Sequence, residues 1–100
     1  MAFKRSRRIK VTATVRASDY GASFAESRED DRAQWFYLRC VQAFTAIGRL
    51  RRSVVSDRGS RMEFSTIVRV PVHQSTADIT AALRAALPRL LNLEVQPMYR

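Results

Sequence analysis

Residues 53–72 read SVVSDRGSRMEFSTIVRVPV, two strand-like runs joined by a turn. The second run, residues 61–72, alternates apolar and polar side chains with the period of two that is typical of a half-buried strand. The first run, residues 53–56, is short and carries two adjacent valines. Residues 57–60 (Asp-Arg-Gly-Ser) suit a tight turn, because their glycine is free to adopt a positive φ. The stretch therefore predicts a β-hairpin.

A helix is predicted on each side of this hairpin. The first covers residues 28–48, where apolar side chains recur at helical spacing. It follows a capping-box-like start at Ser27 and has a plausible stop at Gly48. The second helix begins with a similar motif at residues 75–78, and Pro88 is expected to end it, because the residue before a proline disfavours helix.

Strands are predicted at both ends of the chain. Residues 9–16 alternate in the same way as the hairpin strand, and residues 91–99 form the last strand. The resulting order, strand–helix–strand–strand–helix–strand (βαββαβ), matches the ferredoxin-like split βαβ arrangement. We therefore predict an α+β fold in which a four-stranded antiparallel sheet carries two helices on one face.

The chain has 100 residues, enough for one domain and its core. We predict a basic N-terminal arm at residues 1–8, followed by a single domain at residues 9–100. The sheet face away from the helices is expected to be largely polar. It should carry Lys10, Thr12, Thr14, Arg16, Glu63, Ser65, Ile67, Arg69, Glu94, Gln96 and Met98.

Positive charge is the most distinctive feature of the composition. The chain has 18 Lys and Arg residues against nine Asp and Glu residues, a formal net charge of +9. Such an excess in a small domain attracts polyanions, of which nucleic acid is the commonest and an anionic membrane surface the next. Only Lys4 and Lys10 are lysines. Arginine suits bidentate phosphate contacts, although a codon bias would also favour arginine over lysine.

The predicted topology brings two basic runs to the same end of the domain. The first helix runs back toward the arm, so the short link that follows it should lie near the arm. His73 and Arg100 should lie nearby. The candidate nucleic-acid-binding residues are Lys4, Arg5, Arg7, Arg8 and Lys10 in the first run and Arg49, Arg51 and Arg52 in the second. The alternative reading of these cations is a solvated surface that keeps the protein soluble.

The exposed sheet face suggests two further possibilities. RNA-recognition domains share this element order and stack bases on aromatic side chains of the central strands. Here the outward positions hold no aromatic residue, because Phe64 is predicted to point inward, so we do not expect base stacking on the sheet. The face could instead pack against a second copy of the chain. Trp35, off the main apolar stripe of the first helix, is a possible partner contact, unless the stripe is simply wide.

No constellation of catalytic residues is visible. Cys40 and His73 are the only residues of their types, and Cys40 lies on the apolar stripe of the first helix. The acids at residues 29–31 are explained by helix capping and the helix dipole rather than by a metal. We therefore expect no enzymatic activity, no catalytic residues, no metal and no cofactor. No apolar run approaches the ~20 residues needed to span a bilayer, and we expect a location in the cytoplasm or inside an assembled particle.

These observations favour a non-enzymatic nucleic-acid-binding module that contacts the phosphate backbone through the basic arm and an Arg-rich loop at residues 49–52. The sequence does not distinguish DNA from RNA. The alternative is a structural or assembly subunit of a larger viral or ribonucleoprotein complex, acting through protein–protein contacts. A homo-oligomer formed through the exposed sheet face would fit either hypothesis.

Overall fold

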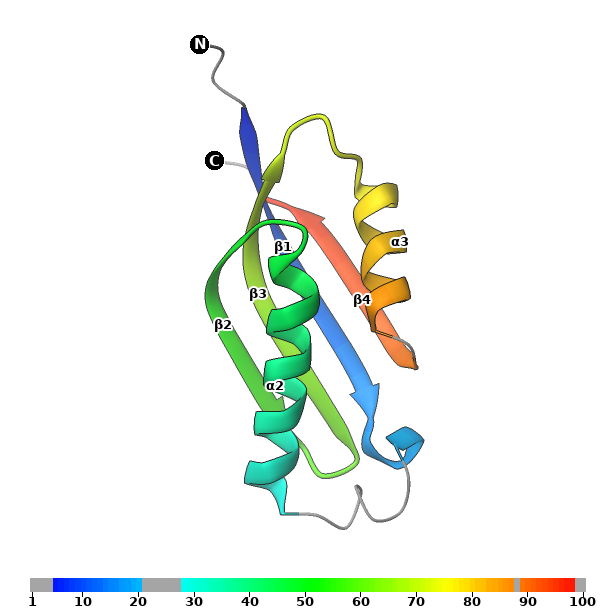
Figure 1. Ribbon diagram of the computed structural model, residues 1–100. Coiled ribbons are helices and arrows are strands. Elements are labelled where there is room, and N and C mark those ends of the chain that lie inside the picture. The colour runs from blue at the N-terminus through cyan, green and yellow to red at the C-terminus, as the bar shows by residue number, and fades with distance from the viewer. Residues whose placement is uncertain (1–4, 21–27, 88, 99–100) are drawn as a thin grey trace.

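The computed structural model describes residues 5–20, 28–87 and 89–98. The predicted order of strands and helices is confirmed (Figure 1). A short 3-10 helix, η1, is added after the first strand. The elements are β1 (Ser6–Arg16), η1 (Ala17–Tyr20), α2 (Glu29–Thr45), β2 (Arg49–Asp57), β3 (Arg61–Pro71), α3 (Thr76–Ala86) and β4 (Leu90–Pro97).

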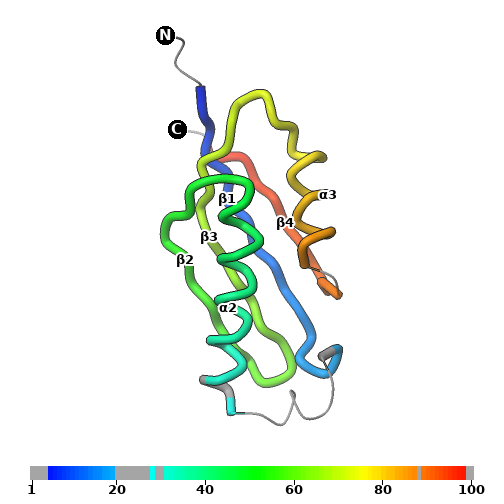
Figure 2. Tube along the Cα trace, viewed as in Figure 1, coloured from blue at the N-terminus to red at the C-terminus, as the bar shows by residue number. Residues whose placement is uncertain are grey.

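The four strands form one sheet in the order β2-β3-β1-β4, and every neighbouring pair is antiparallel. Both helices cover the same face of this sheet (Figure 1). The α+β ferredoxin-like fold is therefore as the sequence predicts. Helix α2 packs on β2 and β3, whereas α3 packs on β4 (Figure 2). The opposite face of the sheet, called the open face below, is not covered by either helix.

The core fills the space between the sheet and the helices. The alternation in β1 and β3 places every second side chain on this inner face. Phe64 is fully buried and meets the ring of Phe44 edge to face, with 5.2 Å between centroids, an arrangement that aromatic pairs prefer. The inward prediction for Phe64 is confirmed. The buried apolar side chains of the sheet and helices include Ile9, Val11, Val15, Phe36, Cys40, Met62, Val68, Val70, Ile79, Leu83 and Leu93.

A buried ion pair joins the start of α2 to the hairpin turn. The Arg32 guanidinium donates to both carboxylate oxygens of Asp57, at 3.1 and 3.0 Å, and each side chain is only 5% exposed. The same carboxylate accepts from the amide of Gly59, whose φ of 82° is the positive value predicted for this turn. Bidentate Arg–carboxylate geometry is specific, so the pair fixes how α2 approaches the hairpin.

The helix ends follow the sequence signals only in part. Ser75 caps α3 as predicted, because its hydroxyl accepts from the amide of Asp78 at 3.1 Å, and α3 ends at Ala86, before Pro88. Helix α2 starts one residue later than predicted. Its N-cap is Arg28, which makes no side-chain capping bond, and the expected cap at Ser27 lies outside the described residues.

Strands β1 and β2 begin three and four residues earlier than predicted, and β4 begins one residue earlier, at Leu90. The run at residues 49–52 is not a loop, because β2 already begins at Arg49. Its backbone pairs with β3, but a β-bulge between Arg51 and Val54 interrupts the side-chain alternation. Period-two patterns cannot show a strand across such a bulge. Strand β1 likewise begins at Ser6, so part of the expected arm is strand.

Gly48 allows the chain to pass from α2 into β2. A Cβ atom built on this residue would lie 2.1 Å from the carbonyl oxygen of Arg69 and 2.9 Å from Cγ1 of Val68. No larger residue fits without displacing the backbone of β3. The glycine that the sequence suggested as a helix stop is therefore required by the close approach of two backbones.

We expect Gly48→Ala to lower the free energy of unfolding by about 1–3 kcal/mol, as overpacking does in a close-packed site. Gly59→Asn is the matched control. Nothing lies within 4 Å of a Cβ at Gly59, and Asn adopts positive φ at little cost. Urea titration of both variants measures the difference, and an unfolding midpoint unchanged by Gly48→Ala would contradict the close approach.

Candidate functional site

Three arginines form a row across the open face. The register pairs Arg8 of β1 with Arg69 of β3, and Arg69 in turn with Arg49 of β2. Neighbouring strands lie ~4.8 Å apart, so three guanidinium groups occupy adjacent positions. In the next row, Lys10 and Arg51 flank Ile67. Two basic runs about forty residues apart in the sequence are thus brought together, as predicted.

The β-bulge in β2 adds a further arginine to this surface. In a regular strand, Arg51 and Arg52 would point to opposite faces. Here Arg52 has a φ of 53°, in the left-handed region, and both side chains line the same hollow on the open face. A bulge commonly redirects a side chain in this way. We call Arg8, Lys10, Arg49, Arg51, Arg52 and Arg69 the proximal cluster.

The buried hydroxyl of Thr66 closes the bulge from the core side. It donates to the carbonyl oxygen of Arg51 at 3.0 Å and lies 2.9 Å from the hydroxyl of Ser53. The residue is only 1% exposed. A buried polar group of this kind is tolerated because it is fully hydrogen-bonded, and its bonds hold the backbone that carries Arg51 and Arg52.

The proximal cluster surrounds a partly apolar floor. Arg8, Arg51 and Arg52 line a hollow of about 440 Å³ together with Ile67 and Met98. A neighbouring hollow of about 380 Å³ lies among Arg49, Arg51 and Arg69, beside Leu50. These surfaces can hold anionic oxygen atoms on guanidinium groups while the floor contacts an apolar portion of the same ligand.

The cluster lacks internal charge compensation. Within the part of the chain that the structure describes, no side chain of the proximal cluster takes part in a hydrogen bond or ion pair. Like charges directly opposite each other on neighbouring strands destabilise a sheet. The arrangement therefore does not contribute to folding, but a bound anion would relieve the repulsion.

The other predicted basic residues lie elsewhere. Arg7 is on the helix side of β1 and donates to the carbonyl oxygen of Gln74 at 2.9 Å, so it ties β1 to the segment before α3. Arg5 is exposed just before β1. His73 follows the end of β3, which pairs with the start of β1, and it is exposed there. Lys4 and Arg100 lie outside the described residues.

Arg69 is the site residue that sequence reasoning missed. Its position between the buried Val68 and Val70 predicted that it faces outward, and this is confirmed. The alternation of side chains could not show that Arg69 lies between Arg8 and Arg49 on the neighbouring strands. That requires the register of β3 with β1 and β2, which are separated from one another by a helix in the sequence.

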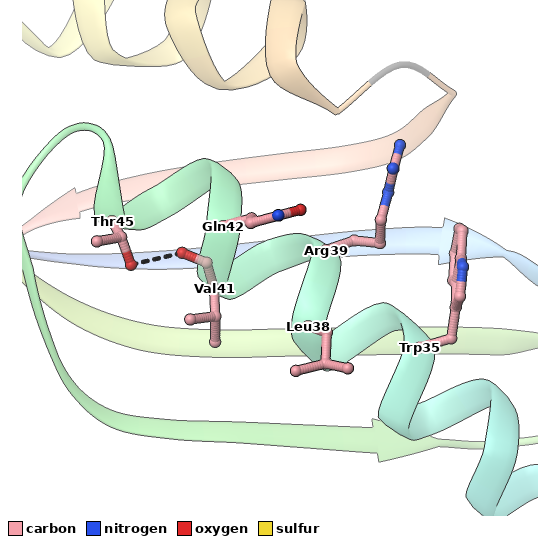
Figure 3. A pocket seen from close by; sticks show the side chains of 6 residues that line it. All are labelled: Trp35, Leu38, Arg39, Val41, Gln42 and Thr45. Carbon is pink, nitrogen blue, oxygen red and sulfur yellow. Dashed lines mark hydrogen bonds between the residues drawn. The ribbon is translucent and has the colours of Figure 1, made fainter.

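A second surface runs along the outside of α2. Trp35, Leu38, Arg39, Val41, Gln42 and Thr45 line a hollow of about 600 Å³ (Figure 3). Leu38 is 57% exposed, and the guanidinium carbon of Arg39 lies 5.5 Å from the Trp35 ring centroid, in cation–π contact. Trp35 lines this hollow beside Leu38 and Gln42, but it is also half-buried and packs against the core, so the apolar stripe of α2 is wide enough to include it.

The remaining candidate residues do not assemble into a reactive site. Cys40 is fully buried, and burial raises the pKa of its thiol to about 12, so the thiolate that acts as a nucleophile is suppressed. Over the described ranges, no group of three His, Cys, Asp or Glu side chains could hold a metal ion. None of the described helices is both long and apolar enough to cross a membrane.

Comparison with known proteins adds fold but no function. No protein-family model matches the chain, and no curated protein matches it. A protein of unknown function from Galdieria sulphuraria superposes with a TM-score of 0.60 at 11% identity, over 96% of this chain and 47% of the other. An uncharacterized protein from Thermotoga maritima gives a TM-score of 0.53 at 12% identity, over 95% and 100%. The chain thus spans about half the length of the first of these structures.

We expect Cys40 to resist a coloured thiol reagent at pH 8 in the native protein and to react fully in urea, because burial keeps it protonated and inaccessible. The matched control is Cys40→Ala/Gln42→Cys, which moves the thiol to an exposed position on the same helix. Equal reaction rates of the native protein and this control would show that Cys40 is accessible.

Proposed function

We propose that this chain binds the phosphate backbone of nucleic acid through the open face of its sheet. The observation that carries the proposal is the uneven division of charge between the two sides of the molecule. Among the residues that the structure describes, the open face holds two carboxylates, those of Glu63 and Glu94. The described cations on the same face are nine: Arg8, Lys10, Arg16, Arg49, Arg51, Arg52, Arg58, Arg61 and Arg69.

The other described side chains are less unequal in charge, with seven arginines (Arg5, Arg7, Arg28, Arg32, Arg39, Arg84 and Arg89) against four acids. Asp19, Asp31 and Asp78 lie off the open face, and Asp57 is buried with Arg32. A surface that only keeps a protein soluble mixes both signs of charge. Concentrating cations on one face instead produces a field that attracts a polyanion to that face.

The chemistry of the face favours phosphate contacts over base recognition. Arginine binds phosphate oxygens in a bidentate manner, and the proximal cluster offers guanidinium groups with no partner among the described residues. Among these residues no aromatic side chain points to the open face, because Phe64 is buried. Binding that depends on phosphate is sequence-independent and strongly reduced by salt.

We expect Arg49→Ala/Arg69→Ala to weaken binding of a fluorescent oligonucleotide by about tenfold or more at low salt and to reduce the log–log salt slope by about one per residue. Fluorescence anisotropy over a salt series gives both quantities. The control is Arg28→Ala/Arg84→Ala, which removes two exposed arginines away from the open face.

The stability of the same variant separates a binding role from a structural one. Because Arg49 and Arg69 are directly opposite each other, removing them should leave the thermal midpoint unchanged or raise it. Equal loss of affinity in the test variant and the control would mean that net charge, not the open face, governs binding.

Assembly through α2 is a second candidate function, favoured by the exposed Leu38 beside Trp35. A second copy of this chain is the occupant that the charges favour. Two open faces would repel each other, whereas the described residues that line the α2 hollow include a single cation, Arg39, which lies over the Trp35 ring. Aromatic residues flanked by apolar ones are common at the centres of interfaces.

If this second function holds, we expect the chain to be dimeric at micromolar concentration and the Leu38→Glu variant to be monomeric. The reason is that a glutamate in the centre of the interface would lose its hydration without gaining a partner charge. Light scattering coupled to size exclusion measures the mass. Gln34→Glu is the control, on the same helix but outside the hollow. A monomer for the unaltered chain would remove this candidate.

A further inference from the structure

A second group of arginines lies at the other end of the open face. Arg16 of β1 is directly opposite Arg61 of β3. Arg58, in the hairpin turn, lines a hollow of about 360 Å³ with Arg61, Thr14 and Glu63. No hydrogen bond or ion pair within the described residues uses the side chains of these three arginines. We call Arg16, Arg58 and Arg61 the distal cluster.

The two clusters are separated by a strip without cations. Along β1, Arg16 lies six positions after Lys10, which is about 20 Å at the usual rise per residue, and eight positions after Arg8, which is about 27 Å. The described open-face positions between the clusters are uncharged except for two carboxylates. They hold Thr12 and Thr14 on β1, Val54 and Ser56 on β2, Glu63 and Ser65 on β3, and Leu91, Asn92 and Glu94 on β4.

This order of charges is poorly matched to a single strand lying along the face. A continuous phosphate chain that bridges the clusters would place several phosphates over the strip and so near Glu63 and Glu94. Repulsion between these groups would oppose the attraction at both ends. A single strand held by the proximal cluster alone would avoid this cost.

A duplex matches the same order of charges. It presents two phosphate ridges separated by a groove. The major groove of B-form DNA is about 12 Å wide, and the distance between the ridges is larger because their own width is added. The minor groove of A-form RNA is also wide. Ridges on the two clusters would leave the strip facing the groove. There, carboxylate and amide oxygens can accept hydrogen bonds from the amino groups of bases.

We infer that the ligand of the open face is double-stranded nucleic acid, with one phosphate ridge on the proximal cluster, the other on the distal cluster, and the carboxylate-bearing strip toward the groove. This inference rests on the proposed function and names its ligand class. It adds Arg16, Arg58 and Arg61 as contact residues.

The test compares 20-base-pair DNA and RNA duplexes with their separate strands, using fluorescence anisotropy on the full chain over a salt series. We expect at least one duplex to bind about tenfold more tightly than its strands at equal salt. Arg16→Ala/Arg61→Ala should reduce the salt slope on that duplex by about two, one per lost phosphate contact, while single-strand affinity stays within about twofold. Arg28→Ala/Arg84→Ala is again the charge-matched control.

The strip gives an independent measurement. The double variant Glu63→Gln/Glu94→Gln removes the two carboxylates that would repel the phosphates of a single strand. Single-strand affinity should therefore rise more than duplex affinity. Asp31→Asn/Asp78→Asn makes the same change in net charge on the helix side, where both residues are exposed, and should raise the two affinities equally.

The outcomes separate this inference from the function on which it rests. Equal or tighter binding of single strands, or no effect of Arg16→Ala/Arg61→Ala on the duplex, overturns the duplex assignment. If Arg49→Ala/Arg69→Ala still weakens binding in that case, the proposed function stands. Absence of binding to every probe at low salt overturns both.

Discussion

The β-bulge in β2, held by the buried hydroxyl of Thr66, is the constraint on which the open face depends. Leu50 and Val55 both pack against the core, yet they are five residues apart and would face opposite sides of a regular strand. Two residues of β2, Arg52 and Ser53, stand opposite Thr66 of β3, and this extra residue restores the alternation. The hydrogen bonds of Thr66 to Arg51 and Ser53 stabilise the arrangement.

This solution to a packing problem determines where charge lies. Because the bulge absorbs one residue, Arg51 and Arg52 can both line the open face while Leu50 and Val55 stay inside. The register on its N-terminal side then places Arg49 beside Arg69. Burial of apolar side chains, the dominant favourable contribution to folding, thus holds together arginines that repel one another.

The sequence was sufficient for those parts of the fold in which one strand face is uniformly apolar. The alternation in β1 and β3 predicted the inner face, the outward position of Arg69 and the absence of a stacking aromatic at Phe64. The turn glycine and the Ser75 cap could also be predicted, because each depends on only a few neighbouring residues in the sequence.

The remaining features depend on contacts between residues distant in the sequence. The predicted start of β2 was wrong because the bulge interrupts the period-two pattern of the strand. The need for glycine at position 48 arises from the nearby backbone of Arg69. Arg7 was grouped with the binding residues because its bond to Gln74, 67 positions away, has no local signature. The opposition of Arg16 and Arg61 likewise follows only from the register of β1 with β3.

The central claim is that nucleic acid lies on the open face. Its most direct test is a nuclear magnetic resonance titration that follows the guanidinium Nε–H signals of the arginines as a short duplex is added. We expect the signals of Arg8, Arg49 and Arg69 to shift together and saturate with the ligand, while those of Arg28 and Arg84 stay in place. Shifts confined to residues around Trp35, or spread evenly over all arginines, would contradict it.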